Sequence, residues 1–294
     1  MWVIFSLLTS MISAVYDLCN QNSKLKAEVF IIYRGLFVAM LATPLALLYF
    51  HIFPWQFYAI ALFQGICVSY LDYRYFQLCQ KFGAENVKGL WPLNVFIIFL
   101  FWLLLKPDTL ATYLETPLRS FIIITSLLLM VFAMTKSRGS QIGKVFFKEL
   151  LPILCLSSII DISNKSITEY SDGCLLALAF QRVAITGWII GGVNLFFNRK
   201  KLTSYKELIE PQNIFRGLFI GLMLLRMVFI NLAMYYTPNP SYVSAIILLT
   251  VIWIVCINKT KSWLGKTTSY QSVGLQWILL LLFAAVALII ATQR

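Results

Sequence analysis

The sequence contains few charged residues and a single histidine. Charged side chains make up 12% of its 294 residues, about half the usual share of a soluble protein. Acidic residues are half as frequent as basic ones, with 12 Asp and Glu against 24 Lys and Arg. Apolar residues reach 60%, and the mean hydropathy is +0.81. This composition excludes an ordinary soluble domain and predicts an integral membrane protein embedded in lipid.

Motifs for catalysis, metal binding and nucleic-acid binding are also missing. His51 is the only histidine, and the six cysteines include no Cys-x-x-Cys pair. Without a Ser-His-Asp set or an H-E-x-x-H motif, we expect no enzyme activity, no metal site and no cofactor. The basic residues lie mostly in short loops between apolar segments rather than on one face, which argues against nucleic acid as a partner.

Apolar stretches of about 20 residues, the length that crosses a bilayer as a helix, occur ten times. The expected spans are 2–21, 28–50, 54–79, 84–105, 117–135, 147–168, 172–197, 213–236, 239–257 and 272–291. Short loops join them and carry no domain of their own. The sequence therefore predicts an all-α polytopic membrane protein with ten transmembrane helices.

The loop at 136–146 divides these spans into two sets of five. We expect a first repeat at 1–135, a cytoplasmic linker at 136–146 and a second repeat at 147–294. An odd number of helices in each half reverses the second half in the membrane, so the prediction is a 5+5 inverted repeat. Loops after odd-numbered spans hold sixteen Lys and Arg, against three after even-numbered spans and at the C-terminus. This bias predicts a cell (inner) membrane protein with both termini outside the cytoplasm.

A polar pattern occurs twice inside the apolar sequence. The first expected span contains Ser13, Asp17 and Asn20, and the sixth contains Ser157, Asp161 and Asn164, each 144 residues after its counterpart. The spacing i, i+4, i+7 places each set on one helix face. A carboxylate in lipid is costly unless it faces protein or water. The two faces therefore predict a polar cavity between the halves, in which these aspartates and asparagines act as coupling or cavity residues.

Two interpretations of Asp17 and Asp161 stay open. In the first, each carboxylate contacts a cation or exchanges a coupling proton within the cavity. In the second, each pairs with an arginine of the following span, either Arg34 or Arg182, which lie 148 residues apart. An arginine inside a membrane needs a partner, so for the two arginines we favour the structural pairing.

Two further expected spans carry candidate substrate-binding residues. The span 54–79 places Tyr70, Tyr73 and Gln77 at i, i+3, i+7, a polar and aromatic stripe, with Asp72 to one side. In the span 213–236, Arg226 has no acidic residue nearby and is the best candidate for holding an anionic group of a ligand. The alternative for Arg226 is a salt bridge to Asp72 across the repeat axis.

The fourth expected span contributes Trp91 and Asn94 to the same candidate site. Trp91 either forms a wall of the cavity and stacks on a planar or cationic group, or packs against a neighbouring helix. Within the expected spans, five basic residues face three acidic ones: Arg34, Arg74, Lys165, Arg182 and Arg226 against Asp17, Asp72 and Asp161. This excess favours a substrate with an anionic group, such as an amino acid or another carboxylate.

Ten short-looped helices in two halves resemble the drug/metabolite transporter superfamily, specifically its ten-helix EamA-type branch. The resemblance is carried by the two polar sets, by Arg34 and Arg182, and by the segments 83–92 and 238–245. The glutamate that many members carry after the fourth and ninth helices is absent at 105–108 and 258–260. The resemblance implies a central cavity, alternating access and transport of a small organic solute.

The expected function is therefore secondary, gradient-driven transport of a small polar or amphipathic metabolite by alternating access, with the proton as a candidate coupling ion. The alternative is a non-transporting membrane interaction or structural protein, in which the polar faces close on each other and leave no cavity. A membrane enzyme acting on lipid is a third hypothesis, with the weakest support from the residues.

Overall fold

The computed structural model describes residues 1–22, 26–82, 87, 91–136, 144–198, 211–221, 223–263 and 274–292. This part of the chain is all-helical and contains no β-strand. Most of the expected linker at 136–146 and the side chain of Asn20 lie outside the described residues.

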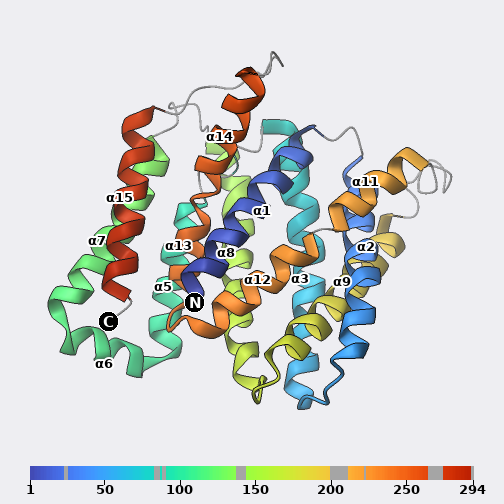
Figure 1. The fold of residues 1–294 in the computed structure, drawn as a ribbon, viewed down its shortest axis with the longest axis horizontal. Coiled ribbons are helices and arrows are strands. Elements are labelled where there is room, and N and C mark those ends of the chain that lie inside the picture. Colours follow the sequence, from blue (N-terminus) through green and yellow to red (C-terminus); the bar gives the residue numbers. More distant parts are fainter. Residues whose placement is uncertain are drawn as a thin grey trace.

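The helices form one bundle, coloured along the chain in Figure 1. Its first half contains α1 (Trp2–Asn22), α2 (Ala27–Leu48), α3 (Trp55–Phe82), α5 (Pro92–Leu105), α6 (Pro107–Glu115) and α7 (Pro117–Lys136). Its second half contains α8 (Lys144–Ile167), the 3-10 turn η1 (Thr168–Tyr170), α9 (Leu175–Asn198), α11 (Pro211–Gly221), α12 (Met223–Tyr236), α13 (Pro240–Ile247), α14 (Thr250–Trp263) and α15 (Leu275–Thr292). A described helix lies in each of the ten ranges expected from the sequence.

Three details of these helices differ from the expectation. A short helix, α6, follows α5 at an angle of 101° and was not expected. The eighth expected span is described as α11 and α12. The ninth is divided into α13 and α14, because the backbone turns at Leu248 and Leu249.

Five helical segments are long and apolar enough to cross a membrane. They are Ala27–Leu48, Lys148–Tyr170, Leu175–Phe197, Pro240–Lys261 and Leu275–Thr292. The bent pair α5–α6 supplies a sixth if it counts as one span, and Trp2–Leu18, Pro117–Ala133 and Leu224–Tyr236 are shorter apolar helices. These segments indicate a membrane protein. Among the described residues, five or six segments are thus long and apolar enough to span a membrane, whereas the sequence predicts ten spans.

The helices of the two halves pack against one another throughout the bundle. The most extensive contact joins α2 to α9, and α7 packs against α15 at the left edge of Figure 1. Between these pairs, α1 contacts α12, α13 and α14, while α3 contacts α8 and α9, and α5 contacts α8 and α13. This arrangement brings residues from both halves into the same interior, where the polar side chains of the next section meet.

Small residues allow the closest of these contacts. Gly35 of α2 lies directly against the backbone of Gly191 on α9, and Gly187 lies against Ala39. Helices in membranes associate closely where small residues let their backbones approach. The α2–α9 crossing therefore depends on the absence of side chains at these positions.

Candidate functional site

A small polar chamber lies in the interior of the bundle. It has a volume of about 120 Å³ and is lined by residues of α1, α2, α3, α8, α9, α12 and α13, together with Trp91. Six charged groups line it, three of each sign: Arg34, Arg182, Arg226, Asp17, Asp72 and Asp161. Charged groups inside an apolar bundle are costly unless they are paired or face a water-filled cavity, so the partners of each group decide what the chamber can do.

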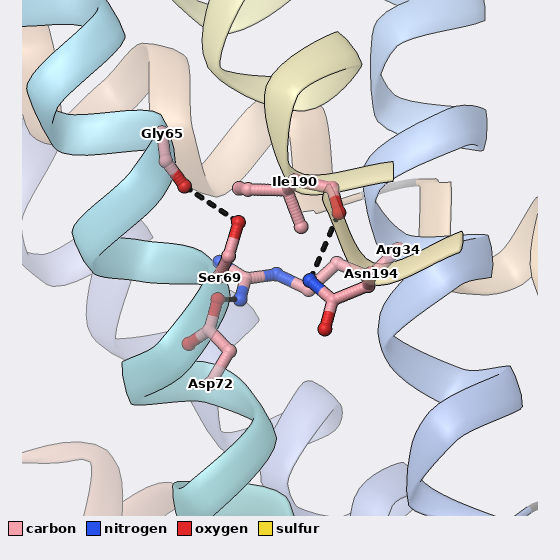
Figure 2. Close-up of polar contacts among 6 residues, drawn as sticks. All are labelled: Arg34, Gly65, Ser69, Asp72, Ile190 and Asn194. Carbon is pink, nitrogen blue, oxygen red and sulfur yellow. Dashed lines mark hydrogen bonds and ion pairs between the residues drawn. The ribbon is translucent and has the colours of Figure 1, made fainter. Parts of the chain in front are cut away.

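Arg34 and Asp72 neutralise each other. Their side chains form an ion pair between α2 and α3 and are 5% and 14% exposed. Figure 2 shows the Arg34 side chain reaching from α2 toward Asp72 on α3, past Ser69. The expected pairing of Arg34 with Asp17 is therefore wrong in this structure. So is the alternative pairing of Asp72 with Arg226, because the Asp72 carboxylate is occupied by Arg34.

Neighbouring side chains in Figure 2 bond within their own helices. Ser69 Oγ donates to the carbonyl of Gly65 at 2.7 Å, and Asn194 Nδ2 donates to the carbonyl of Ile190 at 2.9 Å. Both are polar groups satisfied by the backbone one turn earlier. Of the interactions drawn in Figure 2, the ion pair is the one that joins two helices.

Arg182 is held by amide oxygens rather than by a carboxylate. Its Nε donates to Gln64 Oε1 of α3 at 2.7 Å, and its two terminal nitrogens donate to Asn231 of α12 and Asn164 of α8. Four helices meet at this guanidinium. The expected Asp161–Arg182 pair is absent, since three neutral carboxamides take the places in which a carboxylate was expected.

Asp17 is bonded to a tyrosine that the sequence analysis did not select. Tyr75 Oη of α3 donates to Asp17 Oδ1 at 3.1 Å, and the residue Asp17 is only 2% exposed. The ring of Tyr75 also makes an edge contact with Trp91, at 5.3 Å between centroids. Asp17 is therefore tied into the chamber wall.

Asp161 is held by two neutral donors. Asn94 Nδ2 of α5 lies 3.3 Å and Ser244 Oγ of α13 lies 3.2 Å from Asp161 Oδ2. Asn94 is itself fixed, because it also donates to Ser157 Oγ at 3.4 Å and accepts a bond from Ser158. Asn94 is fully buried behind the chamber, so its place is to orient Asp161 rather than to line the cavity.

Arg226 has one bonding partner among the described residues. Its Nε donates to Ser13 Oγ of α1 at 2.7 Å. Within the described part of the chain, Arg226 and Asp161 each have no oppositely charged group at ion-pair distance, although both line the chamber. The chamber therefore contains one cation and one anion, both partly exposed, that do not take part in an ion pair.

The expected stripe on α3 does not face the chamber. Tyr70 is 55% exposed on the outside of the bundle, Tyr73 Oη donates to Glu28 at 3.0 Å, and Gln77 accepts from Arg74 at 3.3 Å. The inward face instead contains Val68, Leu71, Asp72 and Tyr75, which are also spaced as one helix face. The structure thus places the face with Asp72 at the chamber and Tyr70, Tyr73 and Gln77 outside its lining.

The expected excess of positive charge is not present around the chamber. Arg74 and Gln77 line a separate open groove of about 740 Å³ together with Lys26, Glu28, Lys81 and Glu149. Lys165 donates to the carbonyl of Tyr235 at 3.3 Å and is not part of the lining. Three arginines and three aspartates remain in the chamber lining, so the charge count no longer favours a purely anionic substrate.

Sequence reasoning missed three polar groups of the chamber: Tyr16, Tyr75 and Ser244. Tyr75 follows Asp72 by three residues, so the helix spacing contained a signal that it shares the inward face. Ser244 lies in a run of small and apolar residues, where a hydroxyl carries little sequence signal. Trp91, by contrast, was singled out from the sequence and does line the chamber.

The sequence matches no family model, and no curated protein matches it.

Proposed function

We propose that this protein is a secondary transporter that carries a small polar solute through the chamber by alternating access. The single observation that supports this most is the unpaired placement of Arg226 and Asp161 in one cavity. A membrane protein that only needed stability would gain by pairing these charges or replacing them with apolar residues. Two opposite charges that line a cavity without an ion-pair partner favour a solute that supplies the missing counter-charges.

The proposal includes ten spans arranged as a 5+5 inverted repeat. Helix contacts support it, because they recur when each helix is exchanged for its counterpart in the other half. In the order of the expected spans, the counterpart of α1 is α8, that of α2 is α9, that of α3 is α11 with α12, that of α5 is α13 with α14, and that of α7 is α15. The contacts α2–α9, α7–α15 and α5–α13 each join a helix to its own counterpart. The contact α1–α12 corresponds to α3–α8, and the contact α3–α9 corresponds to α2–α11. A two-fold relation between the halves predicts such a pattern.

The α2–α9 crossing supports the same relation at the level of single residues. Gly35 lies against Gly191, and Ala39 lies against Gly187. A shift of 152 residues converts the first contact into the second. The shift of 148 that separates Arg34 from Arg182 differs from this by one helical turn, so the two arginines are not equivalent positions in the proposed repeat.

The orientation in the membrane follows from the charge bias of the loops. We propose that the loops after odd-numbered spans are cytoplasmic, in a cell membrane, and that α1 starts on the outer side. Membership of the drug/metabolite transporter superfamily, with its EamA-type branch, stays a prediction from the residues quoted above. It is consistent with the proposed repeat and with a central cavity.

Uptake by liposomes containing the purified protein tests the proposal. A panel of labelled amino acids, short carboxylates, amines and sugars is offered with and without a pH gradient, against protein-free liposomes. We expect uptake of at least one solute, driven by the gradient and lost in Arg226→Gln. The matched control is Arg74→Gln, which removes an arginine of α3 that lies outside the chamber and should retain uptake.

Absence of uptake across the whole panel contradicts the proposal and favours the non-transporting membrane protein. Uptake that survives Arg226→Gln unchanged also contradicts it, because the solute then takes a route other than the chamber.

A further inference from the structure

We infer that the chamber binds a compact zwitterion, with the carboxylate of the ligand on Arg226 and its ammonium group on Asp161. This inference rests on the proposed transport function and names the substrate class of the same site. It follows from which charged groups of the chamber are already engaged within the protein, from the atoms left available on the other two, and from the size of the cavity.

Four of the six charged groups in the lining are already engaged within the protein. Arg34 and Asp72 form an ion pair, and Arg182 is surrounded by three carboxamide oxygens. Asp17 is bonded to Tyr75 and is 2% exposed. Arg226 and Asp161 are both partly exposed, so they are the two opposite charges that a ligand in the chamber can contact.

Arg226 has the atoms that a carboxylate needs. Its Nε is engaged by Ser13, and the described residues place no acceptor on its two terminal nitrogens. The planar guanidinium group donates two parallel bonds to a carboxylate, which is a stronger and more directional contact than a lysine makes. Ser13 fixes the guanidinium in one orientation and leaves that edge free.

Asp161 has the atoms that an ammonium group needs. The bonds from Asn94 and Ser244 both end on Oδ2, so Oδ1 has no bonding partner among the described residues. Both donors are neutral, and they orient the carboxylate without cancelling its charge. Trp91 also lines the chamber, and an aromatic ring adds attraction for a nearby cation.

The volume of the chamber restricts the ligand to a small molecule. At about 120 Å³ it is well below the roughly 300–1,000 Å³ of pockets for drug-sized ligands. Half of the remaining lining is apolar and aliphatic, including Leu71, Ile160 and Ile230. These apolar side chains suit a short hydrocarbon body between or beside the two charges, as in a small amino acid.

Ligand-induced stabilisation of the purified protein tests this inference separately from transport. A ligand that binds the folded state raises the melting temperature. The zwitterions glycine, L-alanine and γ-aminobutyrate are compared with propionate, which lacks the amine of alanine, and ethylamine, which lacks its carboxylate. We expect at least one zwitterion to stabilise the protein, and propionate and ethylamine to do so about tenfold more weakly or not at all, since each loses one charged hydrogen bond.

Single substitutions should shift the preference in opposite directions. Asp161→Asn is expected to weaken zwitterion binding and to make propionate the better ligand, while Arg226→Gln is expected to favour ethylamine. Arg226→Lys retains the charge without the planar fork and should bind the zwitterion with intermediate affinity. It also serves as the informative variant if Arg226→Gln does not fold. Arg74→Gln should bind as the unaltered protein does.

The inference is overturned if no zwitterion stabilises the protein, if propionate or ethylamine does so equally well, or if Asp161→Asn and Arg226→Gln leave zwitterion binding unchanged. In each case the transport proposal is judged independently by the liposome panel. Uptake of another solute there means that the substrate class is wrong. No uptake of any solute means that transport is wrong as well.

Discussion

Gly35 of α2 and Gly191 of α9 face each other where the two helices cross, and their backbones touch. A Cβ atom added at Gly35 would overlap the backbone of Gly191, which cannot move aside as a flexible side chain would. We therefore predict that Gly35→Ala destabilises the protein by about 1–3 kcal/mol, as overpacking typically does. Thermal unfolding in detergent measures the change.

Gly192→Ala is the matched control for that substitution. It lies next to Gly191 on the same helix, and a Cβ there would meet no atom within 4 Å. We expect it to be neutral or slightly stabilising, because alanine favours a helix more than glycine does. Equal destabilisation by the two variants would show that α2 and α9 do not cross as described.

The ion pair between Arg34 and Asp72 leads to a second prediction. Arg34→Gln leaves the Asp72 carboxylate buried without its cation, and Asp72→Asn does the reverse. Breaking a buried pair in this way costs about 3–5 kcal/mol. The double variant should be more stable than either single variant, because neither charge then remains unpaired. Thermal unfolding of the four proteins closes the double-mutant cycle.

The exposed pair Lys81–Glu149 supplies the comparison. Its atoms are 3.5 Å apart, and its side chains are 59% and 30% exposed. Solvent screens such a pair, so Lys81→Gln should change the stability by no more than about 1 kcal/mol. A loss as large as that of Arg34→Gln would contradict the different environments assigned to the two pairs.

Two ion pairs lie at opposite ends of α8 and give a prediction about orientation in the membrane. Lys81 pairs with Glu149 near the start of α8. Lys106 pairs with Glu169 of η1, which follows the end of α8, at 2.9 Å. In a background without the native cysteines, Lys81→Cys should react with an impermeant thiol reagent from the cytoplasm alone. Lys106→Cys should react only from outside. Labelling of both positions from the same side would rule out the proposed topology.

The positions of most helices along the sequence could be predicted, because charged loops interrupt a strongly apolar chain. The short helix α6 could not, since Pro107–Glu115 is a polar stretch of nine residues that resembles a loop in composition. The turn at Leu248 and Leu249 between α13 and α14 involves neither glycine nor proline. Nothing local in the sequence marks it.

The sequence allowed us to predict which charged residues belong to the candidate site, but not which of them contact one another. Asp17, Asp72 and Asp161 stand out because a carboxylate within apolar sequence is rare and costly, and all three line the chamber. Sequence spacing gives the position along a helix, whereas partner choice depends on which helices are neighbours and how each is rotated. That is why Arg34 was assigned to Asp17 rather than Asp72, and why Tyr70 was chosen instead of Tyr75.

The central claim is that the chamber is hydrated and opens to each side of the membrane in turn. Ser244 lines it and donates to Asp161, so a cysteine there reports on access to the site at little structural cost. The most direct measurement is the labelling of Ser244→Cys by a small impermeant thiol reagent, added to one side of oriented vesicles at a time. Ala233→Cys, in the fully buried core, is the unreactive control. We predict labelling of Ser244→Cys from both sides. Labelling from one side only would contradict alternating access, and labelling from neither side would mean that the interior is a closed polar core.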